Sequence, residues 1–305
     1  MFIYVTFHSL VFVFNLLPLR LQVNPDSETS AAKDVVDPSS RLLQALNDQS
    51  PAAINECVTA DDTKVWINND VDPKQLVNPV VDFKDVESVT CLTFASLVND
   101  FQTVRQLVES GSDVRVTDWT GCTPLHYACA SRVEAQAKVE YMLQRDASLV
   151  NATNYSENAV LDPEDDASLW RYSTPLHVAA RHGQTHCVKT LVDVGKAPVY
   201  ATDGLGWTAL HRAAEAGHAE AVEVLVQHPD CRVNATDEEG WTALHLAALL
   251  GRAEAVEVLV SHPRCDVSIT DEYGDTAADL ARGRQHGDIA ALIEAKAKGK
   301  FRNYL

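Results

Sequence analysis

Apolar residues in the second half of the chain occur in pairs of short segments, each with the spacing of one helix face. Within residues 206–239, the first segment ends before Gly217, and the second places Val222, Leu225 and Val226 on one face of a helix. Glycine between the two segments predicts a turn. Neither short helix can bury its apolar face alone, so the pattern predicts helix pairs that pack on one another.

The helix-pair pattern repeats with a period of 33 or 34 residues. The ranges 206–239 and 240–273 are identical at 24 of 34 aligned positions. A fixed period of this length is typical of proteins built from stacked repeats. One residue marks the same position in six copies, with a longer gap between the second copy and the third: Thr90, Thr123, Thr174, Thr208, Thr242 and Thr276.

Four copies carry Thr-Pro-Leu-His-x-Ala or the same motif with Ala for Pro, three of them have a glycine in the middle, and residues 233–237 read Val-Asn-Ala-Thr-Asp. With this period and these motifs, the chain resembles the ankyrin-repeat family over residues 87–298. The resemblance implies an all-α ankyrin-repeat solenoid of about six helix–turn–helix repeats with projecting hairpin loops. It also implies that one residue of each motif fixes the turn into the first helix by hydrogen bonds to the backbone: His126, His177, His211 and His245.

Some copies depart from the pattern. The second copy has Arg132 in place of the glycine and about three extra residues, and an acidic insertion at 155–172 follows it. Insertions of this kind lie in the projecting loops of repeat proteins. The first copy has Thr93 in place of the histidine, and the last has Gln285 in place of the glycine. Weak motifs at both ends are expected of capping repeats.

The chain outside the repeats divides into four parts. Residues 1–21 are apolar and could be a signal peptide, a membrane anchor, a packing arm or an artefact of the gene model; without a basic start or a small-residue cleavage site, membrane or secretory use is the minor alternative. Residues 22–40 are polar and predict a flexible linker. Residues 41–86 predict a degenerate N-terminal cap followed by an irregular acidic segment, and residues 299–305 form a basic tail.

Charge and cysteine content narrow the classes of function. Forty-three acidic residues outnumber 25 basic ones, and a net charge of −18 disfavours binding to nucleic acid or to an anionic membrane. The seven cysteines are odd in number and form no Cys-x-x-Cys pair, which argues against a disulfide framework and a zinc ribbon. A reducing compartment, the cytoplasm or nucleus, fits best.

The sequence contains no convincing catalytic or metal-binding motif. His182, His186 and Cys187 resemble part of a metal site, but Gly183 between the histidines predicts that they lie on different helices. We find no glycine-rich phosphate loop and no nucleophile motif. We therefore expect no catalysis, no metal and no cofactor.

Members of the family bind partners on one concave surface, formed by the hairpin tips and the exposed positions of the first helices. Mapped onto this chain, that surface predicts these partner-binding residues: Trp119, Arg181, His182, Leu205, Trp207, Glu238, Glu239, Trp241, Leu249, Leu250 and Tyr273. Trp207 and Trp241 could equally pack between successive hairpins, whereas Trp119 and the two leucines need not be apolar for the stack. An apolar centre with an acidic rim predicts a partner segment that carries Lys or Arg beside an aromatic or aliphatic anchor.

These observations predict a monomeric, non-catalytic adaptor or scaffold that binds a protein partner. The alternative is the same scaffold tethered to a membrane by residues 1–19.

Overall fold

A computed structural model describes residues 38–48, 50, 52–54, 57, 90–118, 120–154 and 171–299. Within these ranges the chain forms α-helices and one 3-10 helix and no strand, which confirms the predicted all-α fold. The apolar segment 1–21 and nearly all of the acidic insertion lie outside the described residues.

In the part of the chain that the structure describes, six helix pairs follow one another, as the period predicts. The first helices are α4 (Cys91–Val98), α6 (Pro124–Ala130), α8 (Pro175–Arg181), α10 (Ala209–Ala216), α12 (Ala243–Leu249) and α14 (Ala277–Gly283). The second helices are α5 (Phe101–Glu109), α7 (Ala135–Arg145), α9 (Thr185–Asp193), α11 (Ala219–Gln227), α13 (Ala253–Ser261) and α15 (Gly287–Ala297). A 3-10 helix, η3 (Ala147–Asn151), follows α7.

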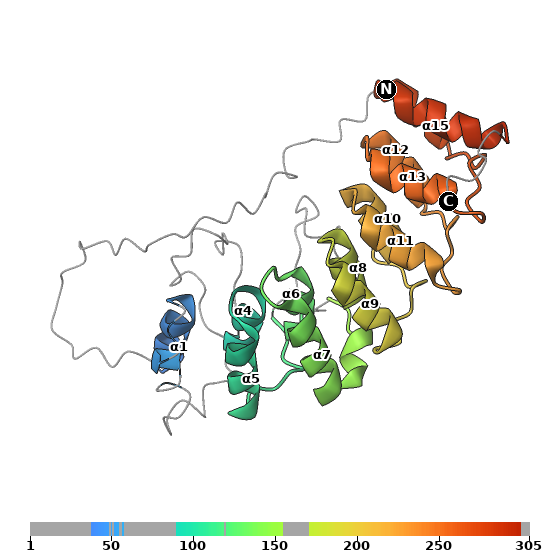
Figure 1. Cartoon of the computed structure of the whole chain (residues 1–305). Helices are drawn as coiled ribbons and strands as arrows, with labels where there is room; N and C mark the ends of the chain where they lie inside the picture. The colour runs from blue at the N-terminus through green and yellow to red at the C-terminus, as the bar shows by residue number, and fades with distance from the viewer. Residues whose placement is uncertain are drawn as a thin grey trace, which may run out of the picture.

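Each helix packs on its partner in the pair and on the equivalent helices of the neighbouring pairs, which gives two layers of helices. Figure 1 shows that the stack bends into an arc, with the first helices toward its inner side and the second helices toward its outer side. We refer to these two sides as the inner face and the outer face.

The core runs without interruption from one pair to the next. First helices contribute alanines such as Ala213 and Ala214, whose small side chains let neighbouring helices approach closely. Second helices contribute larger residues such as Val222 and Leu225, which are almost completely buried. Burying one such side chain contributes about 1.5–3 kcal/mol, so each pair depends on its neighbours for its stability.

In the third and fifth repeats the turn between the two helices needs glycine because the next repeat packs directly on it. Gly183 has a φ of +64°, and a Cβ there would lie 2.6 Å from the ring of His218. Gly251 has a φ of +70°, and a Cβ there would lie 2.7 Å from the ring of His286. A side chain larger than hydrogen would meet both backbone strain and a steric clash at these positions.

The second repeat makes its turn without glycine and uses polar side chains instead. Ser131 ends α6, and its hydroxyl donates to Leu97 O of the first repeat (2.7 Å). Lys138 of α7 is completely buried, and its Nζ donates to Ser96 O (3.0 Å) and Ser131 Oγ (2.9 Å). Gln184 of the third repeat donates to Ser131 O (2.7 Å). This network links three successive repeats, and burial lowers the pKa of Lys138 to about 8.

The two ends of the stack are closed differently. At the N-terminal end, α1 (Pro38–Asn47) packs on α4, with Leu42 and Leu46 fully buried. This helix begins three residues inside the range expected to be a linker, and proline is favoured in the first turn of a helix. At the other end, Arg282 pairs with Asp279 (2.6 Å) and Glu294 (3.0 Å), so the last repeat presents charged groups to solvent.

Candidate partner-binding surface

An aspartate that recurs with the repeat period builds the hairpin before four of the first helices, α6, α10, α12 and α14. Asp203 Oδ1 accepts hydrogen bonds from the backbone N–H groups of Leu205 and Trp207, both at 3.0 Å. Three further aspartates bond in the same way to the second and fourth residues after them: Asp118, Asp237 and Asp271. Such turns hold the residues between the bonds in a fixed projecting tip.

The threonine and histidine of each motif join the hairpin to the helix, and in three of the four motifs the histidine also bonds to the next repeat. In the third repeat, the Thr174 backbone N–H donates to His177 Nδ1 (3.1 Å). His177 Nε2 therefore carries the proton, and it donates to Ala201 O (3.1 Å) and Trp207 O (3.0 Å) of the next repeat. His126 and His211 make the same link to Ser173 O and Trp241 O.

The backbone-bonding role that the resemblance implies for the motif histidines is thus confirmed, and His245 caps its helix in the same way through the Thr242 N–H (3.1 Å). Burial keeps these side chains neutral. It lowers the pKa of His126 and His177 to about 4 because the charged imidazolium is poorly solvated there, and it also lowers the pKa values of His211 and His245.

The last repeat replaces the histidine with a carboxylate, which the sequence analysis missed. Asp279 Oδ2 accepts from the Thr276 N–H (3.0 Å) and hydroxyl (2.5 Å). Asp279 follows Thr276 by three residues, as the histidine follows the threonine in the other motifs, and this spacing could have identified the cap. A carboxylate cannot donate to a following hairpin, which is consistent with its position in the last pair of the described stack.

A buried ion pair in the fourth repeat was also missed. Arg212 donates to Asp203 Oδ2 through Nε (2.7 Å) and Nη2 (2.6 Å), and its side chain is 2% exposed while that of Asp203 is 0% exposed. The guanidinium lies 4.5 Å from the centre of the Trp207 ring. Arg212 occupies the variable position of the motif. In the sequence, only its separation from the periodic aspartate Asp203 could have indicated the pair.

The hairpin tips place one group of the predicted site residues in a row. We call this row the hairpin ridge; it comprises residues 204–205, 238–239 and 272–273. The tips touch one another, since the Glu272 N–H donates to Glu239 O (2.9 Å). Glu238, Glu239 and Tyr273 are exposed and Leu205 is half-buried, so the ridge is acidic with an aromatic side chain at its C-terminal end.

The C-terminal ends of the first helices place the other group in a second row. We call it the helix-end row: Arg181, His182, Glu215, Leu249 and Leu250. Arg181 Nη1 and Glu215 Oε2 are 3.7 Å apart, which shows that equivalent positions of successive repeats are adjacent. Along the stack the row changes from basic at Arg181 to acidic at Glu215 and apolar at Leu249 and Leu250. His182 is exposed, and the other four members are half-buried. Trp119 lies outside the described residues.

Trp207 and Trp241 differ although they occupy equivalent positions. Trp207 Nε1 donates to Asp237 Oδ2 of the next hairpin (2.8 Å), so its indole packs and bonds within the stack. That contact fits the packing alternative for Trp207. Trp241 is half-buried, and its Nε1 has no hydrogen-bond partner among the residues that the structure describes.

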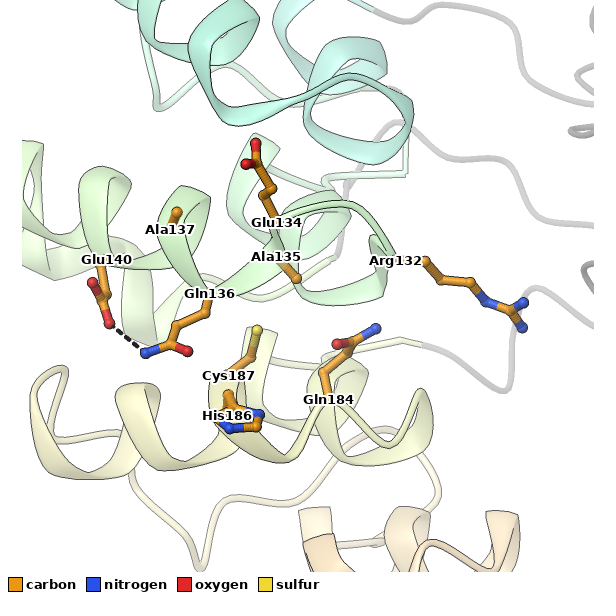
Figure 2. A pocket seen from close by; sticks show the side chains of 9 residues that line it. All are labelled: Arg132, Glu134, Ala135, Gln136, Ala137, Glu140, Gln184, His186 and Cys187. Atoms are coloured by element: carbon orange, nitrogen blue, oxygen red, sulfur yellow. Dashed lines mark hydrogen bonds between the residues drawn. The ribbon is translucent and has the colours of Figure 1, made fainter. Parts of the chain in front are cut away.

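A separate groove of about 420 Å³ lies between the N-terminal ends of α7 and α9. Figure 2 shows Gln136 bonded to Glu140 (2.8 Å) beside His186 and Cys187, while the Arg132 side chain extends away from them. Burial raises the pKa of the Cys187 thiol to about 12, so the thiol is not an activated nucleophile. The histidines of the suspected metal motif lie at the end of α8 and in α9, as Gly183 predicts.

Within the described ranges, no three or more His, Cys, Asp or Glu side chains are grouped so that they could hold a metal ion. Those same ranges contain no helix with the length and apolar character needed to cross a membrane.

Two family models match the chain. One, described as ankyrin repeats in three copies, matches residues 63–154 and 149–237. The other, described as ankyrin repeats in many copies, matches residues 225–281. Together the matches span residues 63–281, which is more than half of the chain, and they include the helix pairs from α4 to α13.

Proposed function

The chain belongs to the ankyrin-repeat family, and on this basis we propose that it is a non-catalytic adaptor that binds a protein partner on the inner face of its stack. Ankyrin repeats generally mediate interactions between proteins. The observation that carries the proposal is the pairing of exposed or half-buried apolar side chains with acidic ones along the two rows that border this face.

The hairpin ridge and the helix-end row supply complementary parts of the proposed surface. Tyr273 is 66% exposed, and Leu249 and Leu250 are half-buried at the ends of their helix, so each can lose further apolar area to water when a partner binds. Glu238 and Glu239 are exposed in the hairpin next to that of Tyr273. The partner segment accordingly carries Lys or Arg beside an aromatic or aliphatic anchor, and the net charge of −18 attracts it before contact.

We place the protein in the cytoplasm or the nucleus, as a monomer. Buried free thiols support a reducing compartment: Cys129, Cys187, Cys231 and Cys265. Burial also raises the pKa values of these thiols, so they act as small apolar core residues.

Removing the apolar anchors tests the proposal. A variant with Leu249→Ser, Leu250→Ser and Tyr273→Ala should bind the partner captured by the wild-type chain at least about 30-fold more weakly, because truncating a binding hot spot costs about 2 kcal/mol or more. Affinity capture identifies the partner, and calorimetry on the purified pair measures the loss. Trp119→Ala is tested separately in the same assay.

Val194→Ser is the matched control, because Val194 is also apolar and is 67% exposed, but it follows the outer helix α9. This variant should bind as the wild type does. Circular dichroism and thermal unfolding must show that both variants keep the fold. Unchanged binding by the folded triple variant, or equal losses in the two variants, would reject the proposed surface.

A further inference from the structure

The second oxygen of the hairpin aspartates normally accepts a hydrogen bond from a donor within the chain. Oδ2 is the atom left over after Oδ1 has fixed the turn. The donors are Tyr127 OH to Asp118 (2.5 Å), the Arg212 guanidinium to Asp203 (2.6 and 2.7 Å) and Trp207 Nε1 to Asp237 (2.8 Å). A buried carboxylate without such a donor is unfavourable, since its charge has lost contact with water.

Asp271 departs from this rule. Its Oδ1 accepts from the Tyr273 and Asp275 N–H groups, both at 2.9 Å, and only 6% of the residue is exposed. Its Oδ2 is buried and has no hydrogen-bond partner in the described part of the chain. Leu280 occupies the position that Tyr127 and Arg212 occupy in their repeats, and an aliphatic side chain has no donor.

The preceding hairpin, which holds an unused donor, touches the Asp271 hairpin. A Cβ at Gly240 would lie 3.1 Å from Asp271 Cα, so the two hairpins are in contact. Trp241 follows Gly240 and is the counterpart of Trp207, yet its Nε1 bonds to no described residue. The half-buried indole of Trp241 therefore loses no hydrogen bond within these ranges if it moves, whereas movement of Trp207 would break its bond to Asp237.

The surroundings of Asp271 favour a positive donor. Glu272 and Asp275 of the same hairpin are exposed, as is Glu239 of the preceding one. Asp275 occupies the position in the last hairpin that Trp207 occupies in the fourth repeat. The last hairpin therefore has a second carboxylate in place of the ring that packs against Arg212. A planar guanidinium can donate to two carboxylate oxygens at once and stack on an indole, which the compact ammonium of lysine does less well.

We propose that the Asp271–Asp275 hairpin is the binding site for an arginine side chain of the partner, with the guanidinium bonded to Asp271 Oδ2 and lying beside the Trp241 indole. This inference rests on the proposed function and specifies the cation that the partner supplies. Because Oδ2 is buried in the free protein, the proposal requires the Trp241 side chain to move aside as the arginine enters. The intramolecular pair of Arg212 and Asp203 is the model for the contact.

The test uses the full chain and a small probe in place of the unidentified partner. In ¹⁵N-labelled protein, N-acetylarginine amide should cause saturable shifts of the Trp241 indole N–H and of the Tyr273 and Asp275 amides. N-acetylcitrulline amide has the same shape without the charge, and it should bind at least about tenfold more weakly. N-acetyllysine amide should fall between the two.

Leu280→Arg is the decisive variant, because it gives Asp271 an internal donor where Arg212 serves Asp203. It should abolish the arginine-dependent shifts, and Leu246→Met, a change at the equivalent position of the previous repeat, should leave them unchanged. Asp271→Asn keeps an oxygen for the turn and should also remove the response.

Three results would overturn the proposal: equal binding of arginine and citrulline, arginine shifts that persist in Leu280→Arg, and no saturable shift at all. If no saturable shift occurs, and if Asp271→Asn shifts the Trp241 indole N–H signal in the absence of the probe, then Asp271 accepts a hydrogen bond from Trp241 within the chain. None of these outcomes depends on partner capture, so this inference and the adaptor proposal can fail separately.

Discussion

Replacing Arg212 with leucine is expected to lower the free energy of unfolding by about 3–5 kcal/mol, because the Asp203 carboxylate then remains buried without its cation. Both side chains of the pair are almost completely removed from water. Leucine itself suits the position, since Leu246 and Leu280 occupy it in the next two repeats. The loss therefore measures the uncompensated charge and not a change in helix propensity. Urea unfolding followed by circular dichroism provides the measurement.

Arg282→Leu serves as the comparison. Arg282 contacts two carboxylates, Asp279 and Glu294, but its side chain is 52% exposed. Exposed pairs contribute about 0–1 kcal/mol, so this variant should unfold close to the wild-type midpoint. Similar losses in the two variants would show that burial of the Arg212 pair does not have the energetic effect assigned to it.

Acid is expected to destabilise the stack by several kcal/mol between pH 6.5 and pH 4. The folded-state pKa values of His126 and His177 are about 4, below the ordinary value of 6.5. The unfolded chain therefore binds protons first as the pH falls, and each of these histidines costs up to about 1.4 kcal/mol per pH unit. His211 and His245 act in the same direction, while burial raises the pKa of Asp118 and opposes them.

Urea midpoints measured at pH 7, 6, 5 and 4 give the slope of stability against pH. His177→Asn should be less stable at pH 7 because the cap is lost. It should also show a shallower slope, because residue 177 then no longer binds a proton more readily in the unfolded chain than in the folded one. His186→Asn is the control, because His186 is exposed and takes no part in a cap. A midpoint that stays constant from pH 7 to pH 4, or a slope unchanged in His177→Asn, would contradict neutral buried caps.

The repeats and their caps could be predicted from the sequence because each copy begins its first helix with the same local hydrogen bonds. A histidine three residues after a threonine reaches the backbone of its own turn, and the spacing alone identifies it. The missed features depend on contacts specific to one copy. Arg212 could have been a solvent-facing residue until the fold placed it against Asp203, and Lys138 bonds to groups of a neighbouring repeat.

The candidate surface was only partly predictable for a related reason. A period of 34 residues aligns Arg181, Glu215 and Leu249 along one edge whatever their chemistry, so the rows followed from the sequence. The two tryptophans could not be assigned in this way. An indole before the motif threonine suits both packing and binding, and only the bond to Asp237 distinguishes Trp207 from Trp241.

Site-specific photocrosslinking tests the central claim, which is that a protein partner occupies the inner face. A photoreactive phenylalanine analogue is placed in turn at Leu250 and Tyr273 on that face and at Lys189 and Val194 of the outer layer, where both side chains are exposed. We predict that irradiation in cells attaches the same polypeptide to the two inner positions and to neither outer one. Crosslinking mainly from the outer positions, or to unrelated proteins from the two inner ones, would contradict the account.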